Sequence, residues 1–600
     1  MCGIVGYIGN KEALPVLVSG LRRLEYRGYD SAGIAVVSGG RVHVRKAPGK
    51  IDALIQSIKQ DPAPQSFLGI AHTRWATHGA PNKINSHPHL SCDKKISVVH
   101  NGIIENYMKL KNALIKEGHK FVSETDTEVL VHLIEKYYRG DLKAAVIAAL
   151  RLVEGSFAIG VVSSDEPDKI VAARQDSPLI VAQGKDSYFI ASDVPAILEH
   201  CRRVIYLKDR QVAVLSQGGV GIYDLNNRKV ALKFDKVTMD AQCAQKDGFA
   251  HFMLKEIHEQ PRVLKRLIAA GLKEITAFEF PKKISNVVVV ACGTAYHAGL
   301  VGKYIIELLA RLPVWVDLSS EFRYRDPIIT KDTLVIAVSQ SGETADTLAA
   351  AREAKKRGAK VISICNVVGS SLTRESNKVF YTLAGPEIGV ASTKAYTAQL
   401  AVFYMLGLRL AFSRKMISAK AYAGYLKTLG RIPSMQEEIL RSKEAIAAVA
   451  KRHHNFGSFL FLGRNINFPS ALEGALKLKE ISYIPAEGYA AGEMKHGPIA
   501  LIDEYRAVVC IAVDSEIYSK MVSNIQEIKA RSGRLIAIAS DGNTSIKAYV
   551  PEVIRVPKCD EFFSPLLVAL PLQMLAYYIA VQRGCNVDQP RNLAKSVTVE

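Results

Sequence analysis

Several common signals are missing from this chain of 600 residues, and each absence removes a class of protein. The nine cysteines are scattered, odd in number and never spaced as C-x-x-C, so neither a zinc site nor a disulfide framework is indicated. No apolar run is long enough to span a bilayer, and the segment from Met1 to Gly9 lacks the basic start of a signal peptide. We therefore expect a cytoplasmic protein in a reducing compartment, with no membrane partner.

Nucleotide and nucleic-acid signatures are also lacking. No G-x-G-x-x-G follows an expected strand, and G-x-x-x-x-G-K-[ST] does not occur. The net charge is +20, but the basic residues are spread along expected helices and form no dense block. An anionic small substrate accounts for this charge better than a nucleic acid does, so we expect no nucleic-acid partner.

The length and ordinary composition, 48% hydrophobic and 23% charged, predict three or four globular domains. In the first third, short apolar runs alternate with helical patterns, which predicts an α/β layered sandwich. The expected strands are Gly3–Ile8, Ala32–Val37, Leu68–Ala71, Ile96–Val99, Phe157–Val162, Ile170–Ala173, Leu179–Val181 and Val204–Leu207. The expected helices are Glu12–Tyr26, Ile51–Lys59, Asn106–Glu117 and Thr127–Leu152.

The first residues, Met1-Cys2-Gly3, contain a candidate nucleophile. If an aminopeptidase removes Met1, Cys2 carries both a thiol and a free α-amine. That amine titrates near ~8 and can act as the base that activates the thiol. The alternative is that Cys2 is only a small residue before a strand.

Three polar clusters follow in the same third, at residues 72–79, 100–106 and 123–128. An Arg can hold a carboxylate with two hydrogen bonds, an Asp can hold an ammonium, and an Asn amide with the next Gly N–H can face an oxyanion. These are the parts needed to bind an amino acid and attack its side-chain carbonyl. Taken singly, Asn101-Gly102 is also a common turn and Ser123–Asp126 a possible helix cap. The histidines at 72, 78, 87, 89 and 100 lie on separate elements without metal-ligand spacing, so no metal is expected.

Together with Cys2, these clusters resemble class II glutamine amidotransferase domains, which have an αββα N-terminal-nucleophile hydrolase fold. The matching stretches are residues 2–6, 27–31, 72–79, 101–102 and 124–126. The resemblance implies that Cys2 attacks the glutamine amide, that Asn101 and Gly102 form the oxyanion hole, that Arg74 binds the α-carboxylate and Asp126 the α-amine, and that Thr77 and His78 line the glutamine site. Glutamate and ammonia would be the products.

The pattern changes after a small, polar stretch at residues 239–248, where we place a domain boundary; a helix from Ala250 is expected to be kinked or broken at Pro261. Buried strands then alternate with helices, which predicts a doubly wound α/β domain. Its strands are expected at Val287–Ala291, Val314–Leu318, Thr333–Val338 and Lys360–Cys365. One helix is expected from Ala295 to Leu312, and another from the end of the 339–344 loop to Arg357. Ligands bind such sheets beyond the carboxyl ends of the strands. Ser339–Thr344 lies there, at a helix N-terminus, and its hydroxyls and backbone N–H groups suit a phosphate, although simple helix capping is the alternative.

A weaker copy of the same plan is expected from Met435 to Pro590, with strands at Ser458–Leu462, Ala507–Val513 and Leu535–Ala539. A helix from Ser470 places Glu473, Lys477 and Glu480 on one face. The apolar residues around this helix predict burial, and buried charges need a partner or a function. A loop with His496 follows. The tail contains Lys595, which is either frayed or able to form a Schiff base with a ketose.

The hydroxyl loop and residues 291–294 resemble the sugar isomerase domain, and the whole chain resembles the isomerising glutamine–fructose-6-phosphate aminotransferase family. The predicted fold is α/β: an αββα N-terminal-nucleophile hydrolase domain (1–239), a linker (240–248), two doubly wound sugar isomerase domains (249–434 and 435–590) and a tail (591–600). The resemblance implies a homodimer with glutamine and fructose 6-phosphate as its substrates. It implies neither a metal nor an organic cofactor.

Roles in the second site follow from the same resemblance. Sugar-phosphate binding is implied for Thr294, Ser339, Gln340, Ser341, Thr344 and Ser392. Lys595 would form the Schiff base, Glu480 would move a proton between C1 and C2, Lys477 would assist, and His496 would open the sugar ring. Trp75, Ala594 and Val597 would border an ammonia channel. The alternative is a phosphosugar sensor with an inactive amidase domain. Two other amidotransferases are disfavoured, since neither a diphosphate-sugar loop nor an ATP-pyrophosphatase loop is found.

Overall fold

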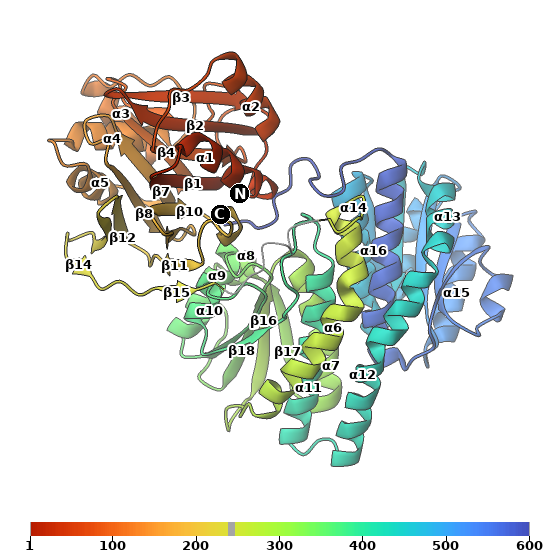
Figure 1. Cartoon of the computed structure of the whole chain (residues 1–600). Coiled ribbons are helices and arrows are strands. Elements are labelled where there is room, and N and C mark those ends of the chain that lie inside the picture. The colour runs from red at the N-terminus through yellow and green to blue at the C-terminus, as the bar shows by residue number, and fades with distance from the viewer. Residues whose placement is uncertain (1, 238–245, 599–600) are drawn as a thin grey trace. The chain divides into compact units, whose positions relative to one another are not determined.

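The computed structural model describes residues 2–237 and 246–598, and its internal contacts divide the chain into two compact units (Figure 1). Unit 1 comprises Met1–Cys243 and Ala594–Glu600, and unit 2 comprises Ala244–Leu593. The predicted removal of Met1 and most of the predicted linker at 240–248 lie outside the described residues. The division does not separate the two expected sugar isomerase domains. The predicted boundaries after residues 239, 248, 434 and 590 therefore stay a prediction.

The described part of unit 1 contains two antiparallel sheets, one of eight strands and one of seven (Figure 1). The first has the order β15-β11-β9-β10-β1-β4-β2-β3 and the second β14-β13-β12-β8-β7-β6-β5. The first sheet consists of β1 (Gly3–Gly9), β2 (Ser31–Ser38), β3 (Arg41–Pro48), β4 (Leu68–Arg74), β9 (Ile180–Gln183), β10 (Ser187–Ala191), β11 (Arg203–Tyr206) and β15 (Asp235–Lys236). The second consists of β5 (His89–Leu90), β6 (Ile96–Ile104), β7 (Gly155–Ser163), β8 (Lys169–Gln175), β12 (Gln211–Ser216), β13 (Gly219–Asp224) and β14 (Lys229–Val230).

Helices cover the outer face of each sheet. Along β1, Ile4 and Ile8 join the apolar layer between the sheets, whereas Val5 and Tyr7 point the other way and pack with α1 (Ala13–Arg22) and α2 (Ile51–Gln60). The second sheet is covered by α3 (Tyr107–Lys116), α4 (Glu128–Tyr137) and α5 (Leu142–Leu150). This is the αββα sandwich that the resemblance implied.

One expected helix is two helices. The apolar pattern at Thr127–Leu152 is interrupted after α4 at Gly140, which has φ +87°, and Asp141 then caps α5 by accepting a hydrogen bond from the Ala144 N–H at 3.1 Å. The short strand β5 and the strands near the end of the unit were not expected from the sequence. They are brief or alternate weakly, although most of them pair with a strand nearby in the chain: β5 with β6, and β13 with β12 and β14.

Each half of unit 2 is built on a five-stranded parallel sheet within the described residues, with the orders β17-β16-β18-β19-β20 and β22-β21-β23-β24-β25. The first sheet consists of β16 (Asn286–Ala291), β17 (Val314–Leu318), β18 (Thr333–Ser339), β19 (Lys360–Cys365) and β20 (Lys378–Tyr381). The second consists of β21 (Ser458–Gly463), β22 (Ala486–Ala490), β23 (Arg506–Ala512), β24 (Arg534–Ser540) and β25 (Glu552–Val556). Both halves are therefore doubly wound, as predicted.

The helices of unit 2 cover both faces of these sheets. Successive residues of β16 alternate between two cores: Val287 and Val289 face α7 and α11, and Val288 and Val290 face α9. The helices are α6 (Phe252–Thr276), α7 (Gly293–Ala310), α8 (Ser319–Phe322), α9 (Ala345–Lys356), α10 (Ser371–Glu375), α11 (Lys394–Ser413), α12 (Ala419–Arg441), α13 (Lys443–His453), α14 (Phe468–Ser482), α15 (Tyr518–Lys529) and α16 (Ser564–Gln582). The predicted division at 434/435 lies within α12.

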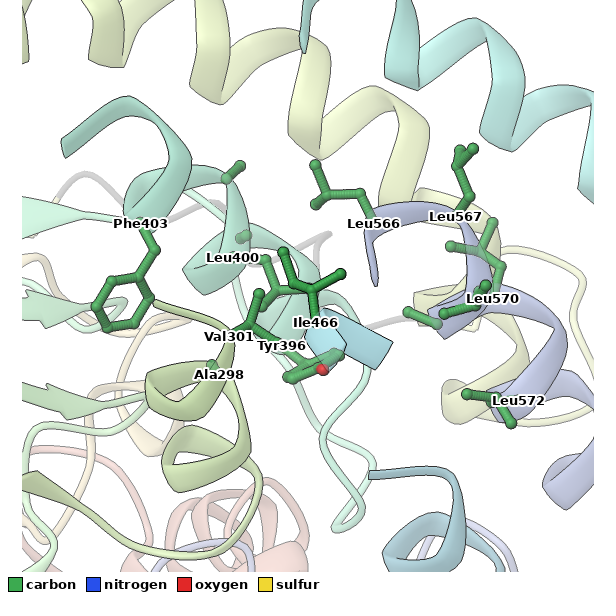
Figure 2. Close-up of a cluster of buried hydrophobic side chains, with 14 of the residues drawn as sticks. Ala298, Val301, Tyr396, Leu400, Phe403, Ile466, Leu566, Leu567, Leu570 and Leu572 are labelled. Carbon is green, nitrogen blue, oxygen red and sulfur yellow. The ribbon is translucent and has the colours of Figure 1, made fainter. Parts of the chain in front are cut away.

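A shared apolar core joins the two halves of unit 2. Figure 2 shows part of it, with side chains from α7, α11 and α16 gathered around Ile466: Ala298, Val301, Tyr396, Leu400, Phe403, Leu566, Leu567, Leu570 and Leu572. Two segments of this core, Lys394–Ser413 and Glu561–Gln582, are long and apolar enough to cross a membrane, contrary to the sequence-based expectation. In each, 89% of the most apolar window is buried inside the protein, as in a core helix.

Helix α6 continues through Pro261, so the helix is not broken there, and the kink that was the other expectation stays a prediction. Proline has no N–H to donate to the carbonyl of Ile257, one turn earlier. The side chain of Gln260 donates to that carbonyl instead, at 3.1 Å. This side-chain hydrogen bond takes the place of the missing backbone bond, which explains how the helix tolerates the proline.

Candidate active sites

The first candidate site lies in unit 1, around the half-buried Cys2 at the start of β1. The backbone of Trp75, just after β4, contacts its sulfur twice: the N–H donates at 3.3 Å and the carbonyl accepts the S–H at 3.6 Å. Burial raises the pKa of the Cys2 thiol, and the Trp75 N–H and the Arg74 charge oppose that rise. The thiol therefore needs a nearby base to become a nucleophile at neutral pH.

Asn101 on β6 is aimed at Cys2. Its side-chain nitrogen donates to the Cys2 carbonyl at 3.0 Å, and its side-chain oxygen lies 3.1 Å from His72 Nε2. His72 Nε2 is also 2.9 Å from the His100 carbonyl, so it carries the proton and donates to both oxygens. Burial lowers the pKa of His72 to about 3, so the ring is neutral. His72 therefore fixes which end of the Asn101 amide faces Cys2, a role that the sequence did not reveal.

Gly102 follows Asn101 with φ +135°. A Cβ at this position would lie 2.0 Å from the Ser156 carbonyl oxygen on the paired strand β7. Only glycine fits here. This backbone turn places the Gly102 N–H next to the Asn101 amide in the chain, as an oxyanion hole of these two groups requires.

Arg74, at the end of β4, is buried and holds the next loop. Its guanidinium donates to the carbonyls of His78, Gly79 at 3.1 Å and Ala80 at 3.4 Å. The carboxylate of Asp30 accepts the Ala76 N–H at 2.8 Å and fixes the start of the same loop. The nitrogen Nε takes part in none of these bonds.

Asp126 is buried just before α4, where one carboxylate oxygen accepts the Ile104 N–H at 2.8 Å. Its other oxygen lies 4.0 Å from His78 Nδ1, and the exposed Thr77 is 3.3 Å from the same nitrogen. Glu124 and Asn85 pair through two hydrogen bonds, at 2.9 and 3.0 Å, and tie the loop before α4 to the loop after Arg74. Cys2, Arg74, Asn101 and Asp126 thus belong to one connected set of strands and loops.

The second candidate site lies in unit 2, at the carboxyl ends of β16 and β18. These strands pair in parallel with Ala291 opposite Val338, so the residues that follow them lie at one edge. Ser339 Oγ is 3.0 Å from Thr344 Oγ1 and accepts the Gly342 N–H at 3.0 Å, and Ser341 Oγ accepts the Glu343 N–H at 3.2 Å. Gly342 has φ +65°, and a Cβ there would meet Ser370 Oγ at 2.0 Å. The loop is therefore a tight, hydroxyl-lined turn before α9, suited to a phosphate.

A buried ionic cluster adjoins Thr294, at the start of α7. Lys477 on α14 is fully buried and contacts Thr294 Oγ1 at 2.9 Å, Glu480 at 2.6 Å and Glu473 at 3.4 Å. Burial alone would lower the pKa of Lys477, but the two carboxylates outweigh it and raise that pKa to about 12. Lys477 is thus a fixed cation that positions Glu480, whose side chain is 21% exposed.

Two residues missed by the sequence reasoning complete this region. His297, on α7, contacts the second oxygen of Glu473 at 2.8 Å. Glu387 accepts from Ser392 Oγ at 2.9 Å and from the backbone of Thr393 and Ala395 at the start of α11. Ser392 is therefore held as part of a helix cap. His297 lies 176 positions from Glu473, so spacing gave no signal for that pair, whereas Glu387 lies five positions before Ser392.

Some predicted site residues are not brought together in the described structure. His496 is exposed at the end of a short 3-10 helix, η5 (Ala491–His496), where a loop was expected, and no described hydrogen bond or ion pair involves it. Gln340 contributes its backbone carbonyl to Asn366 at 3.1 Å. Ala594, Lys595 and Val597 belong to unit 1 and Glu480 belongs to unit 2, so their shared role stays a prediction.

Comparison with known proteins finds a matching family for each of the two units. Residues 72–199 match the glutamine amidotransferase domain family, and residues 282–409 and 455–583 match the SIS domain family. The chain is 52% identical over 609 residues to the glutamine–fructose-6-phosphate aminotransferase (isomerising) of Clostridium tetani, with both chains fully covered. Proteins of the same name from Thermus thermophilus and Methanosarcina acetivorans are 52% and 49% identical, again over the whole of both chains.

A solved structure also resembles unit 2. The C-terminal domain of glucosamine-fructose-6-phosphate aminotransferase from Francisella tularensis is 40% identical, with a TM-score of 0.54, and the match covers 58% of this chain and 99% of that one. The fold and the matched domains define a glutamine amidotransferase joined to a pair of SIS domains. The chain belongs to the isomerising glutamine–fructose-6-phosphate aminotransferase family.

Proposed function

We propose that Cys2 is an N-terminal nucleophile that releases ammonia from glutamine, and that unit 2 transfers this ammonia to a phosphorylated ketose. The overall reaction is that of the family: glutamine and fructose 6-phosphate give glucosamine 6-phosphate and glutamate, the first step of amino-sugar synthesis. The observation that carries the residue-level proposal is the Asn101 amide, which His72 orients toward Cys2.

In the glutaminase step, removal of Met1 exposes the Cys2 amine, which takes the thiol proton. The thiolate attacks the glutamine carboxamide and forms a thioester, with the oxyanion facing Asn101 Nδ2 and the Gly102 N–H. Ammonia leaves, and water then hydrolyses the thioester to glutamate. Arg74 binds the substrate α-carboxylate and Asp126 its α-amine, with Thr77 and His78 at the edge of the site. The buried charges and the hydrogen-bonded loops around them support these assignments.

In the synthase step, the hydroxyl loop binds the sugar phosphate. The proposed ligands are Thr294, Ser339, Gln340, Ser341, Thr344 and Ser392. His496 opens the ring and Lys595 forms a Schiff base with the ketose carbonyl. Ammonia then displaces the lysine, and Glu480, positioned by Lys477, moves a proton from C1 to C2. This transfer reduces C2 and oxidises C1, so no external reductant is needed.

Ammonia stays unprotonated only if it avoids bulk water. We assign this task to a passage gated by Trp75 and bordered by Ala594 and Val597. We also propose a cytoplasmic homodimer that binds no nucleic acid or membrane. Light scattering after size-exclusion chromatography tests the dimer: a monomeric mass that persists at assay concentrations would contradict it.

The test of the function is synthesis of glucosamine 6-phosphate from glutamine and fructose 6-phosphate by wild type, Cys2→Ala and the control Cys585→Ala. Cys2→Ala should lose glutamine-dependent synthesis but still bind fructose 6-phosphate, and Cys585→Ala should retain both. Mass spectrometry should find Met1 absent from active protein. Binding without turnover by wild type would favour a phosphosugar sensor, which nothing in the comparisons supports.

A further inference from the structure

Four potential metal ligands converge on one point in unit 1, away from the residues assigned to glutamine. They are Cys92, His119, His132 and Glu135, and the ligand atoms of all four lie within 4.8 Å of one another. Cys92 Sγ is 3.8 Å from His119 Nδ1 and 3.6 Å from His132 Nδ1. Both imidazole nitrogens also approach the same oxygen of Glu135, at 3.0 and 3.1 Å.

These distances suit a tetrahedral zinc ion. Zinc–sulfur bonds of about 2.3 Å and zinc–nitrogen or zinc–oxygen bonds of about 2.0–2.1 Å place neighbouring ligands about 3.3–3.6 Å apart. The two sulfur–nitrogen separations lie at or just above this range, and the two nitrogen–oxygen separations just below it. A thiolate, two imidazoles and a carboxylate are a ligand set that zinc accepts, and they are too soft for magnesium or calcium.

A second layer of contacts orients the ligands. The Lys120 N–H donates to Cys92 Sγ at 3.4 Å and holds the sulfur in place. The Asp93 N–H donates to Glu135 Oε1 at 3.1 Å and leaves Oε2 for the cluster. On His132, Nδ1 faces the cluster while Nε2 lies 3.6 Å from the buried carboxylate of Glu128. Such a carboxylate behind a histidine is a common device at zinc sites, because it fixes the tautomer and strengthens the ligand.

The four ligands come from three separate segments. Cys92 lies in the turn between β5 and β6, His119 lies in the loop between α3 and α4, and His132 and Glu135 lie three residues apart on one face of α4. An ion would therefore fasten two loops to a helix. Cys92 is exposed and His132 is buried, so the cluster is open to solvent on one side and an ion can enter there.

Hydrogen bonds run from Glu128, which lies 3.6 Å behind His132, along the segment that precedes the proposed glutamine ligand Asp126. Glu128, behind His132, accepts from the Ser123 hydroxyl and N–H, both at 2.7 Å. Ser123 Oγ is 2.9 Å from Thr125 Oγ1, which is 3.1 Å from His89 Nε2. This network runs along the segment that ends in Asp126, so a fixed α4 would steady the proposed ammonium-binding carboxylate.

We propose that Cys92, His119, His132 and Glu135 form a structural zinc site that fastens α4 to the adjoining loops. The ion takes no part in the transfer of nitrogen. It replaces the protons that the cluster would otherwise need and ties together three segments of the amidotransferase domain. The site is independent of the proposed roles of Cys2 and of unit 2.

The test compares the full-length wild type with Cys92→Ser, Glu128→Gln and the control Cys585→Ser. Each protein is loaded with zinc, passed through a chelating resin and analysed for metal by mass spectrometry. Wild type and control should retain one zinc per chain and Cys92→Ser none. Because Glu128 acts through His132, Glu128→Gln should bind zinc about 10–100-fold more weakly, as measured by competition with a chelating dye.

Cobalt provides a readout that does not depend on stability. Loaded wild type should show a thiolate-to-cobalt charge-transfer band in the near ultraviolet, and Cys92→Ser should lack it while remaining folded by circular dichroism. Zinc removal should lower the unfolding temperature of wild type but not that of Cys92→Ser. Equal zinc affinity in wild type and Cys92→Ser, or a cobalt spectrum without the thiolate band, would overturn the proposal. Loss of glutaminase activity in Cys2→Ala leaves this result unaffected, so the two proposals fail separately.

Discussion

At the scale of single residues, the glutaminase site depends on the orientation of one amide. Asn101 can present either its nitrogen or its oxygen to Cys2, and only the nitrogen stabilises an oxyanion. The buried, neutral His72 makes that choice by donating to the Asn101 oxygen. His72 thus acts as a positioning residue, because it has no described contact with Cys2.

We expect Asn101→Ala to lower the glutaminase kcat by about 10²–10³-fold with a smaller change in KM, because the lost donor acts on the developing oxyanion. His72→Phe should lower kcat less, since the amide remains but is no longer held. The measurement is the rate of glutamate release from glutamine in the absence of fructose 6-phosphate. Binding of fructose 6-phosphate to each variant is the control. A decrease of less than tenfold for Asn101→Ala would contradict its place in the oxyanion hole.

Gly102→Ala tests the neighbouring backbone donor. The new Cβ would overlap the Ser156 carbonyl, and φ would stay in a region that alanine avoids. Gly140→Ala is the matched control, because Gly140 also has a positive φ, +87°, but nothing lies within 4 Å of its Cβ. The control should lose about 1 kcal/mol of unfolding free energy, and Gly102→Ala clearly more, together with its glutaminase activity. Equal losses in chemical denaturation would show that the close approach of Ser156 is unimportant.

At the scale of elements, four buried histidines come together from β4, β5, β6 and the loop before β5. His72 stacks on His87 with ring centroids 4.1 Å apart, His87 meets His89 at 4.8 Å, and the His100 N–H donates to His87 at 3.2 Å. Burial lowers the pKa of all four below the usual 6.5, that of His72 to about 3. The rings are therefore neutral in the folded protein at neutral pH.

Stability should fall in acid for this reason. A histidine with a depressed folded pKa stabilises the folded state fully above about pH 6.5, and this contribution is lost as the pH falls toward the folded pKa. His72, whose folded pKa is about 3, costs about 1.4 kcal/mol for every pH unit between 6.5 and that value, and the other three rings act in the same direction. We expect unit 1 to unfold in acid before unit 2, measured by urea denaturation at a series of pH values. His72→Phe should flatten the dependence below pH 6, and an unchanged slope would contradict this account.

The ionic cluster of α14 gives a second prediction at this scale. Lys477→Met leaves Glu473 and Glu480 without their buried cation and should destabilise unit 2 by about 3–5 kcal/mol. The exposed Lys479 on the same helix is the matched control, and Lys479→Met should change the unfolding free energy by less than about 0.5 kcal/mol. Denaturant unfolding followed by fluorescence measures both. If Lys477→Met lowered the unfolding free energy as little as Lys479→Met does, water would have to reach the ionic cluster.

The elements that the sequence predicted are those with a strong local pattern. The Val-rich β16 and the apolar face of α14 can be recognised from a few residues of sequence. In contrast, β5 is only two residues long, and buried and exposed residues hardly alternate along β13. The candidate site was less predictable. Its motifs identify Cys2 and Asn101, but the His72–Asn101 bond and the His297–Glu473 pair join residues 29 and 176 positions apart. Contacts of this kind depend on strand pairing and helix packing, which no local pattern encodes.

At the scale of the whole molecule, the two units have separate cores. Unit 1 has apolar layers between and outside its sheets. Unit 2 has one core that joins its two parallel sheets and a further core on the other face of each sheet. Because the proposed glutamine ligands belong to unit 1 and the proposed phosphate ligands to unit 2, each ligand should mainly stabilise the unit that holds these residues. At a concentration of 100 times the Kd, this stabilisation is about 2.7 kcal/mol.

We therefore expect two transitions in calorimetry of Cys2→Ala, which binds glutamine without consuming it. Glutamine should raise the transition of unit 1, and fructose 6-phosphate should raise that of unit 2. Asp126→Asn should abolish the first shift and Ser339→Ala should reduce the second, which assigns each transition to its unit. A single transition that both ligands raise equally would mean that the two units unfold as one cooperative body, and that the nitrogen donor and acceptor sites are thermodynamically coupled even without catalysis.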